Sequence, residues 1–277
     1  MAILLKELAK LGLNTAQSSY VSLARTIGLI DFPVPPNSSM RKTSSKSVRH
    51  YYDSGLACYL PIAAMAQFYD VALHSPISVL DFGCGVGRQL LHFTRHYPAP
   101  RYYACDIDRT NITFVASNFN VNCYTNSFSP PLRYDSASMD MIYSVSTFSH
   151  FTIEHHKLWL AELVRILKPG GHCFLTTEGL PAFSLMRSIF PSEQHEKRLK
   201  RDGFLYREYP KLHEDKGRRF RIPVANTFMG IDLSYGNTVL LPSYIRENWP
   251  QHGVEVLAII EGIIDKRQDL IVMRKPN

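Results

Sequence analysis

A glycine-rich turn between an apolar run and a helical pattern constrains this chain more than any other feature. The stretch 79–90, VLDFGCGVGRQL, continues an apolar run over Ile77–Leu80 that predicts a buried strand. Asp81 ends that run, and a turn with three glycines, GCGVG, comes before the helical pattern. Glycine has no Cβ atom, so such a turn lets a ligand approach the main chain beside a helix N-terminus. The stretch therefore predicts a strand–turn–helix unit with a ligand-binding crevice.

The glycine spacing distinguishes between two classes of ligand. A dinucleotide fingerprint needs G-x-G-x-x-G, but the third glycine here, Gly87, comes one residue early and Arg88 stands in its place. Asp81 would repel a pyrophosphate and instead suits a ligand with positive charge. The stretch resembles motif I of the class I S-adenosylmethionine-dependent methyltransferases, whose cofactor carries an ammonium and a sulfonium group.

The strand and helix patterns that follow the turn predict an α/β fold. They alternate from Ile77 onward, as in a parallel sheet with crossover helices. The resemblance covers residues 77–178, together with a closing hairpin expected over 254–275. It implies a Rossmann-like, doubly wound sheet of seven strands, six parallel and one antiparallel. In this prediction residues 1–50 are N-terminal helices and a linker, 51–277 form the methyltransferase domain, and 180–248 are an inserted substrate cap.

An acidic residue at the end of the second predicted strand is a candidate ligand for a ribose. Asp106 lies at the end of the predicted strand 101–107, and a carboxylate at that edge can accept hydrogen bonds from both ribose hydroxyls of a nucleoside. The resemblance adds further cofactor contacts and implies S-adenosyl-L-methionine as cofactor and S-adenosyl-L-homocysteine as product. The predicted cofactor-binding residues are Tyr51, Tyr52, Asp81, Gly83, Cys84, Gly85, Gly87, Arg88, Asp106, Ile107, Asn126, Ser127, Ser146 and Thr147.

Two residues beyond later strands are candidates for the chemistry. His150 follows the fourth strand, and an imidazole with a pKa near neutrality can take a proton from an attacking hydroxyl; it could equally anchor its loop. Glu178 ends the fifth strand and is a second base or substrate ligand, unless a neighbouring cation holds it. Asp108 is expected to cap the next helix, and Asp140 to be structural.

For several other segments the sequence predicts a structure but no function. Residues 1–30 predict one or two amphipathic helices, and 31–48, rich in proline, serine and basic residues, predict a mobile linker. The turn 168–171, KPGG, is expected to stop a helix before a strand over 172–178. Arg165 and Lys168 are expected to be solvated charges near that helix end.

Composition narrows the class of protein. The formal charge is +7, which many enzymes carry, and the five cysteines have no paired short spacing that would indicate disulfides or a zinc site, so no metal is expected. There is no run of eighteen apolar residues, so no membrane span is expected, and a cytoplasmic location is the default.

The motifs that are absent favour a small-molecule acceptor. The segment 144–147, SVST, stands where methyltransferases of amide or base nitrogens often carry Asn/Asp-Pro-Pro-aromatic, and no cysteine follows a proline as in the cytosine-C5 class. The preferred hypothesis is O-methylation of a hydroxyl on a secondary metabolite or sugar-like compound. Alternatives are N-methylation of a small amine, RNA methylation with the basic segment 197–221 on phosphates, and a non-catalytic cofactor-binding module; a dehydrogenase conflicts with the glycine spacing. The sequence does not determine an oligomeric state.

Overall fold

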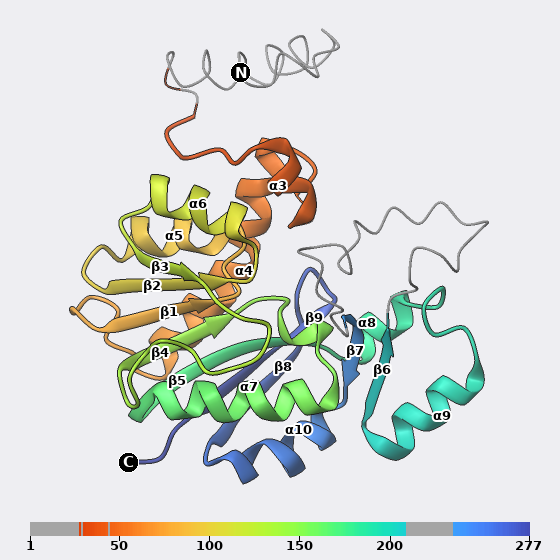
Figure 1. Ribbon diagram of the computed structural model, residues 1–277. Helices are drawn as coiled ribbons and strands as arrows, with labels where there is room; N and C mark the ends of the chain where they lie inside the picture. Colours follow the sequence, from red (N-terminus) through yellow and green to blue (C-terminus); the bar gives the residue numbers. More distant parts are fainter. Residues whose placement is uncertain (1–27, 29, 44, 209–234) are drawn as a thin grey trace, which may run out of the picture. The chain divides into compact units, whose positions relative to one another are not determined.

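The computed structural model describes residues 28, 30–43, 45–208 and 235–277 (Figure 1). The chain divides into two units, Met1–Pro36 and Asn37–Asn277, and all the helices and strands named below belong to the second. The amphipathic helices expected over 1–30 lie almost wholly outside the described residues. In the described part of the chain, no helix has both the length and the apolarity that a bilayer crossing needs.

A seven-stranded sheet forms the centre of the second unit, in the order β3-β2-β1-β4-β5-β9-β8. Neighbouring strands from β3 to β5 are parallel, while β9 is antiparallel to both β5 and β8. Six strands therefore run one way and one runs the other, which confirms the predicted fold. The strands are β1 (Ser78–Phe82), β2 (Arg101–Asp106), β3 (Asn122–Thr125), β4 (Met139–Ser144), β5 (Leu167–Glu178), β8 (Glu255–Ile264) and β9 (Gln268–Arg274).

Helices cover both faces of the sheet, and each face has its own apolar core (Figure 1). Alternate residues of a strand point to opposite faces, and Val79 accordingly packs in one core and Leu80 in the other. The first core contains side chains of α4 (Val48–Phe68), α5 (Arg88–His96) and α6 (Arg109–Asn118). The second contains side chains of α7 (Ile153–Ile166), α10 (Pro242–Asn248) and the 3₁₀ helix η3 (Trp249–His252).

The turn expected at KPGG is instead part of a strand. Helix α7 ends at Ile166, and β5 begins at once with Leu167, paired with Met139. The pairing then skips to Met141 opposite His172, so residues 168–171 form an irregular start of the strand. The neighbouring charges are not simply solvated, because Lys168 bonds the Asp140 carboxylate at 2.7 Å and Arg165 pairs with Glu162. Asp140 also accepts the N–H of Ser78, the structural role expected for it.

The linker expected over 31–48 contains a short helix, α3 (Asn37–Lys42). Ser47 then caps α4, which starts at Val48. A charged contact joins α3 to the sheet edge, since Nζ of Lys42 lies 2.9 Å from the carboxylate of Asp108. Helix α3, which the sequence predicted as linker, therefore contacts the rest of the second unit.

The stretch between β5 and β8 interrupts the alternation of strands and helices, as the sequence indicated. It contains a separate pair of antiparallel strands and a small third core around Phe183, Phe190 and Val239. Residues 209–234, which include much of the basic segment, lie outside the described residues. The elements are α8 (Leu180–Leu185), α9 (Glu193–Asp202), β6 (Phe204–Glu208) and β7 (Gly236–Leu240).

Candidate functional site

The glycine turn connects β1 to α5 with a backbone that other residues rarely adopt. Gly83, Gly85 and Gly87 have φ angles of 77°, 53° and 74°. A Cβ atom on Gly83 would overlap Oγ1 of Thr147, so this position has no room for a side chain. The N–H groups of Gly83 and Cys84 both donate to the Cys105 carbonyl, at 2.9 and 3.0 Å. The turn is thus bonded to the end of β2, and these two N–H groups are already used. Its main contribution to ligand binding is that a ligand can come close to the main chain.

Asp106, at the end of β2, holds the next part of the turn. Its Oδ2 accepts the N–H of Gly85 at 2.8 Å, and its Oδ1 accepts the N–H of Asp108 at 2.8 Å and Nδ2 of Asn111 at 3.4 Å. Burial raises the pKa of this carboxyl, although these three donors act in the opposite direction. Asp108 itself caps α6 by accepting the N–H of Thr110, as expected.

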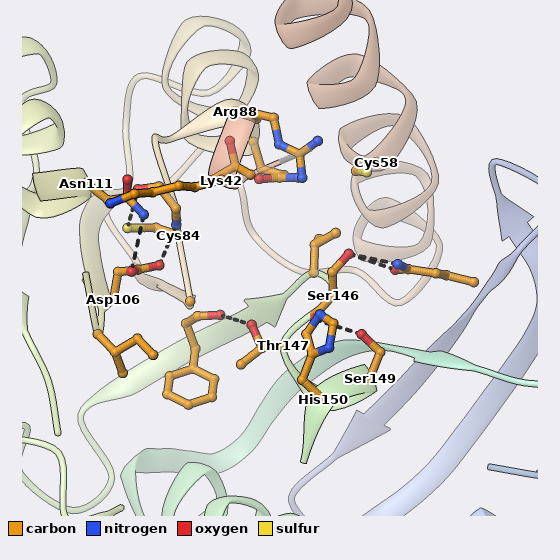
Figure 2. Close-up of a pocket in the computed structure, with 18 of the residues that line it drawn as sticks. Lys42, Cys58, Cys84, Arg88, Asp106, Asn111, Ser146, Thr147, Ser149 and His150 are labelled. Atoms are coloured by element: carbon orange, nitrogen blue, oxygen red, sulfur yellow. Dashed lines mark hydrogen bonds between the residues drawn. The ribbon is translucent and has the colours of Figure 1, made fainter. Parts of the chain in front are cut away.

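One cavity of about 550 Å³ joins the turn to the exit of β4. Figure 2 shows Asp106, Asn111 and Cys84 on one side of it and Ser146, Thr147 and His150 on the other. A volume of this size is within the range of small-molecule and cofactor sites. The predicted residues that line the cavity are Gly83, Cys84, Gly85, Arg88, Asp106, Ile107, Asn126, Ser146, Thr147, His150 and Glu178.

Five predicted cofactor contacts do not line the cavity: Tyr51, Tyr52, Asp81, Gly87 and Ser127. Tyr51 is completely buried, and its hydroxyl donates to the carbonyl of Val86 at 3.2 Å, so it supports the turn from behind. Tyr52 lies edge-on against His92. Asp81 is buried beneath the turn, where burial raises its pKa to about 8.

Three amide side chains at the cavity have unpaired buried atoms. Oδ1 of Asn126, Oδ1 of Asn111 and Nε2 of Gln89 make no hydrogen bond with any residue that the structure describes. A buried polar atom without a partner is costly, so these atoms fit a polar ligand. The expected S-adenosylmethionine has matching groups: the adenine amine can donate to Asn126, and the ribose hydroxyls can donate to Asp106. The residues present therefore fit that cofactor.

The loop after β4 has a constrained backbone. Ser146 has a φ of 64°, which is uncommon for a residue with a side chain. Its N–H donates to Oγ1 of Thr176 at 2.8 Å, its carbonyl accepts Oγ of Ser149 at 2.7 Å, and Nε2 of Gln268 donates to its Oγ at 2.8 Å. Strain of this kind persists only where neighbours hold it, and it is common at functional sites.

His150 follows in the 3₁₀ helix η1 (Phe148–His150), and its ring is held in one orientation. Nδ1 lies 2.9 Å from the carbonyl oxygen of Gly236, and the ring stacks on Tyr235 with centroids 4.6 Å apart. A carbonyl only accepts, so Nδ1 carries the hydrogen and the lone pair of the neutral ring is on Nε2. Burial lowers the pKa of His150, and the charge of Arg267 lowers it further.

Glu178 is paired with a residue that the sequence did not single out. Both Nε and Nη2 of Arg267 contact Oε1 of Glu178, at 2.8 and 2.6 Å. The Glu178 side chain is 4% exposed and that of Arg267 is 44% exposed, and both line the cavity. The arrangement matches the alternative for Glu178, a carboxylate held by a neighbouring cation.

The comparisons with known proteins concern the same region. The sequence model of the family described as "Methyltransferase domain" matches residues 79–171. The tRNA N(3)-methylcytidine methyltransferase trm141 of Schizosaccharomyces pombe is 25% identical over 135 residues, which are 45% of this chain and 50% of that protein. The match thus spans about half the length of this relative.

Solved structures share the fold at low sequence identity. A SAM-dependent methyltransferase from Methanosarcina mazei has a TM-score of 0.52 and 13% identity, covering 76% of this chain and 97% of that chain. An S-adenosylmethionine-dependent methyltransferase from Mesorhizobium loti has a TM-score of 0.51 and 14% identity, covering 79% and 97%. The family match identifies a methyltransferase domain over residues 79–171, and the strand order is that of the class I S-adenosylmethionine-dependent methyltransferase fold.

Proposed function

We propose that this chain transfers a methyl group from S-adenosylmethionine to a hydroxyl of a small-molecule acceptor, such as a secondary metabolite or sugar-like compound. One observation carries the proposal: a single cavity of about 550 Å³ is lined both by the glycine turn with Asp106 and by the β4 exit with His150. Cofactor and acceptor can therefore meet in one cavity.

The cofactor half of the cavity has a division of roles. Gly83 and Gly85 allow close approach, Asp106 accepts from the ribose, and Asn126 accepts from the adenine amine. Arg88, whose Nη1 donates to Ser54 at 3.1 Å, is a further cofactor-binding candidate on the α5 side. When bound, S-adenosylmethionine supplies a methyl group on a sulfonium leaving group, so the protein's task is to orient the reactants, exclude water and remove a proton.

His150 is the candidate general base in the acceptor half. With Nδ1–H donating to Gly236, the Nε2 lone pair can take the proton of an acceptor hydroxyl as that oxygen attacks the methyl carbon. A positioned base contributes roughly 10²–10⁴-fold, and orientation of the reactants about 7–11 kcal/mol. Glu178 is less suited to this task because its carboxylate is covered and bonded to Arg267.

The insertion 180–248 is proposed as the substrate cap. Tyr235 and Asn237, near the start of β7, line the cavity, so the insertion supplies part of the acceptor wall. Its small separate core gives this wall support of its own.

RNA methylation is the second candidate, because the relative from Schizosaccharomyces pombe is named as a tRNA methyltransferase. In the described part of the basic segment 197–221, Arg198 and Arg201 contact Asp202, and Lys200 contacts Glu196. These partners reduce the positive charge available for phosphates. An RNA substrate would make binding fall steeply with salt.

The decisive experiment has two stages. Calorimetry should first detect binding of S-adenosylhomocysteine; absence of binding would overturn the whole proposal. Transfer of labelled methyl groups is then measured with hydroxyl compounds, small amines and a tRNA transcript. We expect turnover with hydroxyl compounds. Turnover with amines alone or with tRNA alone would show that the acceptor is an amine or an RNA and not a hydroxyl compound. Binding of S-adenosylhomocysteine without turnover of any acceptor would favour a non-catalytic module.

A further inference from the structure

The ion pair at the acceptor end of the cavity is asymmetric. Both contacts of Arg267 go to one oxygen of Glu178, Oε1, whereas a fork-to-fork pair would use both oxygens. Among the residues that the structure describes, Nη1 of Arg267 makes no hydrogen bond, and neither does Oε2 of Glu178. The guanidinium therefore keeps donors for a further group.

Arg267, and not Glu178, is the accessible member of the pair. The Glu178 side chain is 4% exposed and its Oε2 is buried, while the Arg267 side chain is 44% exposed and lines the cavity. A molecule in the acceptor half would meet a planar cation with directed N–H groups. Carboxylates match this geometry.

The backbone places Arg267 firmly. It follows the turn between β8 and β9, in which Asp265 and Lys266 have φ angles of 53° and 55°. Its N–H donates to the carbonyl of Ile264 at 3.0 Å, which closes a tight hairpin turn. The next residue, Gln268, pairs with Glu178 across the sheet and bonds Ser146. The guanidinium is thus fixed relative to the β4 exit.

We propose that Arg267 binds a carboxylate group of the acceptor and that Glu178 is a positioning residue that holds Arg267 in place. This inference rests on the proposed function and narrows its substrate class to small hydroxylated carboxylic acids. The bound anion would also offset the positive charge that Arg267 exerts on His150, and so favour proton uptake by that ring.

A small carboxylate suits the surroundings better than a nucleic acid does. A single guanidinium, held against Glu178 in the lining of the cavity, can bind one anionic group. Binding along a phosphate backbone needs a series of cations. The nearby Asp265, which also lines the cavity, would repel further phosphates.

The test uses the full-length protein loaded with S-adenosylhomocysteine and matched probes. Ligand-observed NMR compares salicylate with salicylamide, 4-hydroxybenzoate with 4-hydroxybenzamide, and glycolate with glycolamide. We expect at least one carboxylate to bind, its amide to bind at least tenfold more weakly, and Arg267→Gln to remove most of this difference. Glu178→Gln should weaken the same carboxylate by a smaller factor. A tRNA transcript is included as a competitor.

Two controls separate loss of recognition from loss of fold. Arg274→Gln removes an arginine from the far end of β9, the strand that follows Arg267. Its partner is the exposed Glu255, and the change should leave probe binding unchanged. All variants should bind S-adenosylhomocysteine like the wild type. Equal binding by Arg267→Gln, or no carboxylate binding to the loaded wild type, would overturn the inference. Binding of tRNA that requires Arg267, with no carboxylate bound, would replace it with a phosphate site.

These outcomes are distinct from failure of the proposed function. That proposal fails if S-adenosylhomocysteine does not bind or no acceptor is methylated, whereas probe binding is measured without turnover. In the turnover assay, Arg267→Gln should raise KM for the carboxylate acceptor at least tenfold and change kcat less. A reduction confined to kcat would indicate a role for Arg267 other than acceptor binding.

Discussion

At the scale of single residues, Asp106 combines a structural role with a proposed role in cofactor binding. Its carboxylate holds the N–H of Gly85 and is also the proposed ligand of the ribose. Asp106→Ala should reduce the affinity for S-adenosylhomocysteine about 10- to 100-fold, the loss expected for about 1.5–3 kcal/mol of hydrogen bonding to a charged group. Calorimetry measures this, with the surface variant Asp202→Asn as control. An affinity equal to that of the wild type would refute the assignment.

His150 should leave a signature in the pH dependence of methyl transfer. The base must be neutral to accept a proton, and burial lowers its pKa. We therefore expect kcat/KM to rise with pH, with the midpoint of this rise below about 6.5, the ordinary value for histidine. His150→Gln should reduce the rate roughly 10²–10⁴-fold and abolish this acidic limb. If the limb persists unchanged in the variant, another group is the base.

The cavity residues that belong to the glycine turn could be predicted from the sequence, whereas several other residues that line the same cavity could not. Gly83 and Asp106 belong to a local pattern of strand, turn and helix, so their joint place at the cavity followed from spacing. Gln89, Asn111 and Arg267 also line it, but amides and arginines are common on protein surfaces and nothing local marks them. Arg267 in particular reaches the site through the pairing of β9 with β5, a contact between residues far apart in sequence.

At the scale of elements, periodic segments were predictable and irregular ones were not. Strands β1 and β2 lie close to their predicted positions because their apolar runs are clear. Helix α3 was predicted as part of a linker, since its sequence NSSMRK has little helix preference of its own. Its position depends on tertiary contacts such as that of Lys42 with Asp108.

Asp108 combines two stabilising roles that substitutions can separate. It caps α6 through its side chain and pairs with Lys42, whose side chain is 31% exposed. Asp108→Ala loses both, so the free energy of unfolding should fall by about 1–2 kcal/mol. Asp108→Asn keeps a good cap and loses only the charge, so it should cost well under about 1 kcal/mol. Urea unfolding measures both. Equal losses would show that the cap contributes little.

At the scale of the whole molecule, the second core contains an unusual buried group. His156 is 3% exposed and lies among the rings of Phe148, Phe151, Phe204 and Trp249. Neither ring nitrogen makes a well-formed hydrogen bond with a described residue, and the nearby backbone of Phe148 only partly opposes the effect of burial on the pKa. Burial lowers its pKa to about 3. The protein therefore folds with this histidine neutral, and acid should act on the fold through it.

The sign of this effect follows from linkage. Between pH 3 and about 6.5 the unfolded chain binds a proton at His156 that the folded chain does not bind, so stability falls as the pH falls through this window. The slope from this one group approaches about 1.4 kcal/mol per pH unit. Asp81, with its pKa raised to about 8, makes the free energy of unfolding rise as the pH falls over part of this range. The pH dependence of the wild type alone therefore does not measure the contribution of His156.

The difference between two proteins isolates the contribution of His156. His156→Leu keeps an apolar side chain in the core, and its free energy of unfolding should decline less steeply than that of the wild type between pH 6.5 and 4. As the solution is acidified, the difference in the free energy of unfolding should therefore change in favour of the variant. Urea unfolding at several pH values measures this, with a substitution of an exposed histidine, His74→Leu, as the matched control. A parallel curve for His156→Leu would mean that this ring is protonated without opening the core, and that the acid sensitivity of the fold comes from other groups.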